Sequence, residues 1–81
     1  MSEEVPRNPA FYHPSTHAGQ QRKHRGIEWG QVSQTITDGR VKNSHKEDCK
    51  LFVREFENTT KPVGVVANVE NGHILTIEWR G

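Results

Sequence analysis

The spacing of apolar residues changes once along the chain, close to Gly39. Before that point Trp29, Val32 and Ile36 are spaced three and then four residues apart, which places them on one face of an α-helix. After it, short runs rich in β-branched and aromatic residues follow one another, separated by polar and glycine-containing stretches. The pattern therefore predicts a helical first half and a second half made of strands.

Two helices are predicted, over residues 17–25 and 28–38. The first ends at Gly26 and the second at Gly39, since glycine readily adopts the left-handed conformation that terminates a helix. In the first helix only Ala18 is a clear core residue, and so short a helix is not stable in isolation. We therefore expect tertiary contacts to hold it in place.

Residues 1–15 are predicted to form a flexible leader. Three of the four prolines of the chain lie in this segment, and proline blocks the propagation of a helix. Ser15 or Thr16 could cap the first helix, so the single folded domain is predicted to span residues 16–81.

Three strands are predicted over residues 51–56, 62–69 and 73–80, with a short edge strand at 40–42. Strands that follow one another along the chain without intervening helices pair in antiparallel fashion. The fold class is therefore α+β, with two short N-terminal helices packed on a three- to four-stranded antiparallel meander.

The last hairpin has a predicted register. Asn71-Gly72 between two apolar runs favours a two-residue turn, which places Val66 opposite Ile77. One face of the hairpin is then expected to pack under the helices, with Val66, Leu75, Ile77 and Trp79. The other is expected to be open, with Val65, Ala67, Val69, Ile74, Thr76 and Glu78.

Composition limits the class of protein. The chain has 81 residues, of which 31% are hydrophobic, so it forms one domain with a small core. A net charge of +1 argues against a general nucleic-acid coat, but the RKHR run at 22–25 is a local basic patch suited to a compact anionic ligand. The second predicted helix has no arginine or lysine, which disfavours it as a DNA-recognition helix.

Several kinds of cofactor chemistry lack their sequence signature. The single Cys49 excludes an internal disulfide and a cysteine-based zinc site, and Pro14 separates His13 from His17, so neither a metal nor another cofactor is expected. The glycine-rich loops that bind nucleotides are absent. No segment has the roughly 18–20 apolar residues that span a bilayer, and no signal peptide is visible. We expect a cytoplasmic protein without a membrane partner.

Acid–base groups and cations remain as the candidate chemistry. RNA cleavage through the 2′-hydroxyl needs a base, an acid and a cation, and a histidine at the start of a helix can serve as the base. The candidate catalytic residues are His17, Arg25, Arg54, Thr76 and Glu78, and the candidate nucleic-acid contacts are Arg22, Lys23 and Arg40. Structural roles compete with these: His17 could cap or pack, Arg54 could pair with Glu78, and the RKHR run could be a solvated face.

A set of spaced residues between 16 and 39 follows the approximate pattern H-A-x-x-R-x-x-x-R-G-I, then a second helix, a glycine and a β-meander. The matching residues are Thr16, His17, Ala18, Arg25, Gly26, Ile27, Val32, Ile36 and Gly39. In this the chain resembles a widespread family of small prokaryotic domains of unknown function, which looks related to the barnase, EndoU, colicin and RelE-like nuclease fold. The resemblance implies a metal-independent, RNA-cleaving toxin with His17 and Arg25 in its site and a small antitoxin-like protein as its partner.

One position departs from that pattern. Gln21 stands where the family has an arginine, and Arg22 is displaced from it by about 100° around the helix. If the family's arginine takes part in catalysis, the departure weakens the site. Two alternatives therefore stay open, a non-catalytic protein-interaction module that uses a sheet edge or the open face, and a nucleic-acid-binding regulator that uses the helical hairpin.

Overall fold

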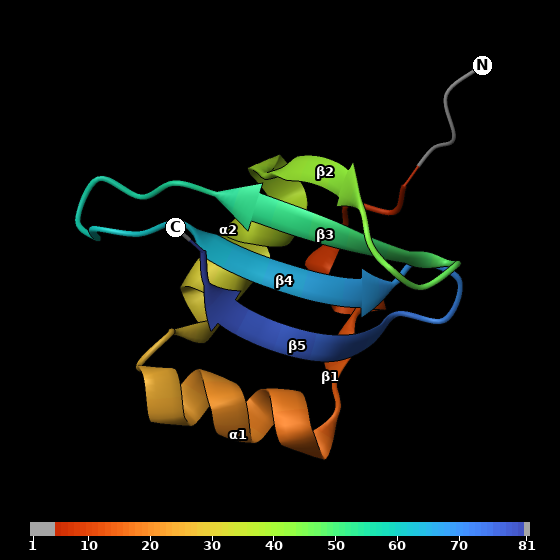
Figure 1. The fold of residues 1–81 in the computed structure, drawn as a ribbon, viewed down its shortest axis with the longest axis horizontal. Coiled ribbons are helices and arrows are strands. Elements are labelled where there is room, and N and C mark those ends of the chain that lie inside the picture. The colour runs from red at the N-terminus through yellow and green to blue at the C-terminus, as the bar shows by residue number, and fades with distance from the viewer. Residues whose placement is uncertain (1–4, 81) are drawn as a thin grey trace.

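The computed structural model describes residues 5–80 and folds them around a five-stranded sheet. Its elements are, in chain order, η1 (Pro9–Phe11), β1 (His13–Pro14), α1 (Thr16–Arg25), α2 (Trp29–Asp38), β2 (Arg40–Asn43), β3 (Cys49–Arg54), β4 (Val63–Asn68) and β5 (His73–Trp79). Helix α2 packs on β3 and β4, and α1 runs beside β5 (Figure 1). The predicted α+β class is confirmed.

Both helices begin at capped residues and end at the predicted glycines, but Gly39 is extended, with φ of −70°, and not left-handed as expected. The Ser15 hydroxyl oxygen accepts a hydrogen bond from the Ala18 amide (3.0 Å), and Gly26 ends α1 in the left-handed conformation, with φ of 70°. At the start of α2 the Gln31 side-chain oxygen accepts from the Glu28 amide (2.9 Å). These contacts satisfy backbone groups that a helix end leaves without partners.

The buried face of α2 differs slightly from the predicted stripe. Val32 and Ile36 are buried as expected, but Trp29 is 43% exposed. Thr35 is buried in its place, and its hydroxyl donates to the Gln31 carbonyl oxygen (2.7 Å), so no polar group of Thr35 is left unpaired. Trp29 lies in the first turn of the helix, where its ring packs against an arginine of α1 rather than against the sheet.

Strands β2–β5 form the predicted antiparallel meander, but the sheet has a further strand. The two residues of β1 pair in parallel with β5, so that His13 lies opposite His73 and Pro14 opposite Ile74. The strand order is β1-β5-β4-β3-β2, which makes the sheet mixed rather than purely antiparallel. The prediction of three or four antiparallel strands missed β1 because two residues around a proline carry no alternating pattern.

The segment upstream of Thr16 is packed onto the domain over its described part, residues 5–15. Tyr12 lies in the core at 8% exposure, and its hydroxyl donates to the Pro6 carbonyl oxygen (2.7 Å). The Arg7 side chain donates from Nε to the Ile36 carbonyl oxygen (2.7 Å) and from Nη2 to that of Gly39. Arg7 therefore places positive charge at the C-terminus of α2, where the helix dipole favours it. Residues 1–4 of the predicted leader lie outside the described part.

The register of the last hairpin differs from the predicted one. Val66 lies opposite Thr76, not opposite Ile77, and a bulge follows between Val66 and Ala67. The Asn68 side-chain oxygen accepts from two amides of the loop, and its carbonyl oxygen accepts from the Gly72 amide (2.8 Å), which lengthens the turn beyond two residues. The predicted faces are corrected accordingly: the core takes Val65, Ala67, Ile74 and Ile77, whereas Val66 lies on the open face.

Phe52 of β3 lies at the centre of the core. Its side chain is fully buried, its ring meets that of Tyr12 edge-to-face with centroids 5.7 Å apart, and the Arg7 guanidinium lies 5.8 Å from its centroid. The residues that share this core are Ala18, Ile27, Val32, Ile36, Val63, Val65, Ala67, Ile74 and Ile77. One core therefore joins both helices, the sheet and the N-terminal segment.

The packing of Tyr12 predicts a stability that falls at high pH. Burial raises the pKa of Tyr12 above its ordinary value of 10.0, and the nearby Arg7 guanidinium opposes this rise. As the pH rises above about 10, the unfolded chain loses the phenolic proton first, so stability declines until the folded-state pKa is passed. Tyr12→Phe removes this decline, because Tyr12 is the only tyrosine of the chain.

Urea unfolding of the wild type and of Tyr12→Phe at a series of pH values tests this expectation. Near neutral pH the wild type is expected to be more stable by about 0.5–1.5 kcal/mol, since it retains the hydrogen bond to Pro6. That difference is expected to shrink above about pH 10. A difference that stays constant across the series would contradict it.

Candidate functional site

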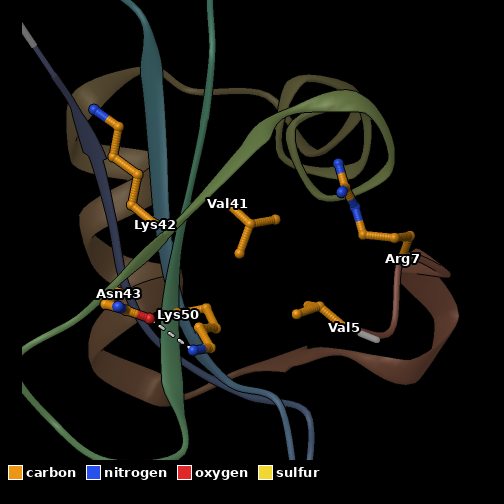
Figure 2. A pocket seen from close by; sticks show the side chains of 6 residues that line it. All are labelled: Val5, Arg7, Val41, Lys42, Asn43 and Lys50. Atoms are coloured by element: carbon orange, nitrogen blue, oxygen red, sulfur yellow. Dashed lines mark hydrogen bonds between the residues drawn. The ribbon is translucent and has the colours of Figure 1, made fainter. Parts of the chain in front are cut away.

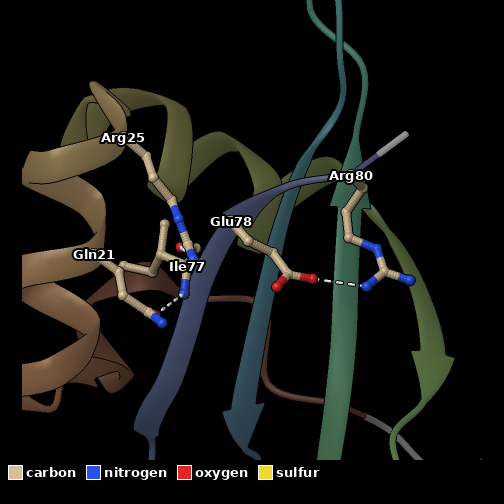
Figure 3. Close-up of polar contacts among 5 residues, drawn as sticks. All are labelled: Gln21, Arg25, Ile77, Glu78 and Arg80. Atoms are coloured by element: carbon tan, nitrogen blue, oxygen red, sulfur yellow. Dashed lines mark hydrogen bonds and ion pairs between the residues drawn. The ribbon is translucent and has the colours of Figure 1, made fainter.

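Helix α1 closes the free edge of β5 with two side chains one turn apart. The Ile77 amide donates to the Gln21 side-chain oxygen (3.3 Å), and Arg25 donates from Nη1 to the Ile77 carbonyl oxygen (2.7 Å; Figure 3). The Trp79 indole then donates to the Arg25 carbonyl oxygen (2.9 Å). Arg25, a candidate phosphate binder, therefore holds α1 against β5 through one end of its guanidinium.

His17 is connected to this edge through Gln21. Because the Gln21 oxygen faces the Ile77 amide, its Nε2 faces His17 and lies 2.9 Å from the His17 Nε2 atom. An amide NH₂ group only donates, so the His17 Nε2 accepts and its proton lies on Nδ1. The lone pair that a general base would use is therefore occupied by Gln21, the residue that departs from the family pattern.

The two basic candidates in the middle of α1 have different environments. Arg22 donates to the Ile27 carbonyl oxygen (2.8 Å), and its guanidinium lies 4.5 Å from the centroid of the Trp29 ring. Arg22 thus joins the end of α1 to the start of α2. Lys23 is exposed to solvent.

Arg54 and Arg40 lie at the far side of the sheet from β5. The Arg54 guanidinium lies 4.5 Å from the centroid of the Phe56 ring, and Arg40 forms an exposed ion pair with Glu55 (3.7 Å). Arg54 is two residues from the core residue Phe52 and so shares the helix side of the sheet. It does not pair with Glu78, whose carboxylate lies on the opposite face (Figure 3).

The open face brings together a different set of groups. The Glu78 carboxylate accepts from Arg80 Nη1 at 2.7 Å (Figure 3), and Thr76 is on the same face, two residues before Glu78. Gly64 lies opposite Glu78 and provides the space for Arg80: a Cβ atom there would stand 2.5 Å from the Arg80 Cγ. The missing side chain lets Arg80 lie flat across the strand.

Beside this pair lies a hollow of about 230 Å³. Its floor contains Leu51 and Val66, which face each other across β3 and β4, and its polar lining comes from Arg80 and from the loop between β2 and β3. That loop passes in front of β3 (Figure 1) and contributes His45. The complete lining is Asn43, Ser44, His45, Leu51, Val66 and Arg80.

Two residues of this surface, His45 and Arg80, were not among the predicted site residues. His45 lies in a polar loop, where no periodicity singles out a residue, whereas Arg80 ends the predicted strand 73–80 and shares a face with Thr76 and Glu78 by alternation. A glycine within an apolar strand, as at Gly64, is a further local signal, since it marks a place where another group comes close to the backbone. Of the predicted residues, the structure brings Thr76 and Glu78 to this face and leaves His17 and Arg25 at the β5 edge.

The fold and this surface define a small α+β protein in which α2 covers one sheet face and α1 lies along the β5 edge, not on the sheet face with α2 as predicted, while a carboxylate, an imidazole and a guanidinium lie on the other face. No protein-family model, no curated protein and no solved structure matches the chain. Within residues 5–80 no three histidine, cysteine, aspartate or glutamate side chains gather as a metal site would require. Neither α1 nor α2, the α-helices of the same part of the chain, has the length and apolar character needed to cross a membrane.

Proposed function

We propose that the chain is a metal-independent ribonuclease whose site lies on the open face, with Glu78, Arg80 and His45 as its working groups. The observation that carries the proposal is the Glu78–Arg80 pair, 2.7 Å apart, beside a hollow that His45 also lines. These are a proton acceptor, a cation for a phosphate and a second acid–base group, on a face that the helices leave free.

The proposed reaction is an attack within the RNA strand. The Glu78 carboxylate takes the proton of a ribose 2′-hydroxyl, and the 2′-oxygen attacks the adjacent phosphorus. The bond from phosphorus to the 5′-oxygen breaks, and the protonated His45 imidazole gives its proton to that oxygen. Arg80 neutralises the charge that develops on the phosphoryl oxygens, and the Thr76 hydroxyl supports the same surface. The products are a 2′,3′-cyclic phosphate and a 5′-hydroxyl.

The order of elements along the chain is a second line of support for the proposed ribonuclease function. The order helix, helix, glycine and β-meander follows the pattern of the small prokaryotic domains that the chain resembles. On that resemblance the protein acts as a toxin on cytoplasmic RNA, and a small antitoxin-like protein inhibits it. His17, Gln21 and Arg25 then have a positioning role, because they hold α1 against β5, which carries Thr76 and Glu78.

Cleavage of matched oligonucleotides tests the proposal. The purified protein is expected to cleave RNA in the presence of EDTA and to leave DNA of the same sequence intact, since DNA lacks the attacking hydroxyl. A DNA strand with one ribonucleotide is expected to be cut only after that ribonucleotide, with a 2′,3′-cyclic phosphate on the 5′ fragment. Intact RNA over a broad pH range, or equal cleavage of RNA and DNA, would overturn the proposal.

A further inference from the structure

The two edges of the sheet differ in how far other parts of the chain cover their backbone groups. The β1–β5 edge is closed: the Ser15 amide donates to the Ile74 carbonyl oxygen (2.9 Å), and α1 side chains bind both backbone groups of Ile77. At the other edge β2 pairs, within the described part of the chain, with β3 alone. Among the hydrogen bonds of residues 5–80, none reaches the outward backbone groups of Arg40–Asn43. This edge is therefore free to accept another strand.

A hollow of about 390 Å³ lies alongside that free edge, on the helix side of β2 (Figure 2). Val5 and Val41 give it apolar walls, and both pack against the edge of the core. Lys50 lies at one end, where its Nζ donates to the Asn43 side-chain oxygen (2.8 Å). The hollow is open to an apolar side chain that enters from beside β2.

Basic side chains predominate among the described residues along this edge. The described residues that line the hollow are Val5, Arg7, Val41, Lys42, Asn43 and Lys50, of which three are basic and none is acidic. Arg40 and Lys42 lie opposite Val53 and Leu51, which places both on the open-face side of β2. In Figure 2 the Lys42 amino group points away from the hollow. Arg40 forms an exposed ion pair with Glu55 (3.7 Å), a contact that contributes little stability and that an incoming carboxylate could replace.

The charges of Arg40 and Lys42 favour an acidic strand over a second copy of the chain as the partner. In a second copy paired edge to edge, Arg40 and Lys42 of the two chains would lie on the same face of the joined sheet, where like charges opposite each other are destabilising. An incoming strand with acidic residues on that face would be attracted instead. Its alternate residues would point to the helix side, where Val5 and Val41 favour an apolar side chain.

We propose that the β2 edge binds an extended segment of a partner protein in which acidic and apolar residues alternate. The segment adds to the sheet as a sixth strand, with backbone hydrogen bonds to β2 and carboxylates beside Arg40 and Lys42. An apolar side chain enters the hollow between Val5 and Val41. This surface adjoins the proposed ribonuclease site, since Asn43 lines both hollows, but the inference stands whether or not the protein cleaves RNA.

Synthetic peptides test the proposal on the full chain. A peptide of about eight residues with alternating glutamate and valine spans β2 and its flanks at roughly 3.3 Å per residue. It is expected to shift the NMR signals of the β2 amides and to slow their hydrogen exchange, since new backbone bonds protect them. The same peptide with lysine in place of glutamate should not bind. A version N-methylated on alternate residues, at the backbone groups that face β2, should also fail.

Charge reversal on the protein completes the test. Lys42→Glu is expected to weaken binding of the glutamate–valine peptide about tenfold, and Lys23→Glu, an equally exposed change on α1, should leave it unaltered. Three outcomes would overturn the proposal: no binding by the wild type, equal binding of the lysine or N-methylated peptide, and signal changes at Thr76 and Arg80 instead of β2. Dimerisation through β2 would also overturn it, because the occupant would then be a second copy.

Discussion

Exchange of Glu78 for glutamine is expected to lower the rate of RNA cleavage by about 10²- to 10⁴-fold while the fold is retained. Glutamine has the shape of glutamate and keeps an oxygen that can accept from Arg80, so the contact across Gly64 survives. It cannot take the proton of a 2′-hydroxyl, which is the step assigned to the carboxylate. Single-turnover cleavage of a short RNA separates this loss of rate from any change in RNA binding.

Matched variants distinguish a catalytic carboxylate from a general charge effect. Glu57→Gln removes the same charge from an exposed loop residue and should leave the rate unchanged. His45→Ala is expected to lower the rate over a range similar to that of Glu78→Gln, whereas His24→Ala, at an exposed position of α1, should not. Full activity in Glu78→Gln would rule out this carboxylate as the base, even if the protein cleaves RNA.

Truncation of Phe52 to alanine is expected to cost about 3–5 kcal/mol of unfolding free energy. The ring is fully buried, and its removal leaves a cavity between Tyr12, the sheet and α2. At about 0.05–0.15 kcal/mol per residue, a chain of 81 residues has a total stability of only about 4–12 kcal/mol. The variant should therefore be largely unfolded in mild denaturant, and at the lower end of that range even without it.

Phe11 provides the control for this truncation. It is also a phenylalanine that contacts Tyr12 edge-to-face, with centroids 5.1 Å apart, but it is 39% exposed. Phe11→Ala should cost about 1 kcal/mol or less, because little apolar surface returns to water. Urea unfolding followed by tryptophan fluorescence measures both variants. Equal losses in the two would contradict the central position of Phe52.

Local sequence signals were sufficient to predict the individual helices and strands. The spacing of Val32 and Ile36 predicted α2, and the glycine at 26 predicted the end of α1, because helix formation and termination depend on neighbours along the chain. The alternating runs likewise predicted β3, β4 and β5. These features depend on residues within one or two turns, so no distant contact was needed to infer them.

Pairing between distant segments was not predictable in the same way. The two residues of β1 become a strand only because β5 lies beside them, and the loop around Asn68 shifts the last hairpin by one residue. Such a shift exchanges the faces of the strand, so Val65 entered the core and Val66 the open face. Asn71-Gly72 alone indicated a shorter turn, because the side-chain bonds of Asn68 lie outside that pair.

By itself, then, the sequence determined the class of the fold, the approximate positions of its α-helices and main strands, and the open position of Thr76 and Glu78. Strand alternation already puts Arg80 on the face of Glu78, but only the tertiary structure decided what lies around them: Gly64 next to Arg80, His45 in the hollow that Arg80 lines, and Gln21 with Arg25 on the backbone of Ile77. The physical reason is the distance along the chain between the residues that interact. A helix or strand follows from neighbours in the chain, whereas the open-face site joins residues from a loop, β4 and the end of β5 that only the folded sheet brings together.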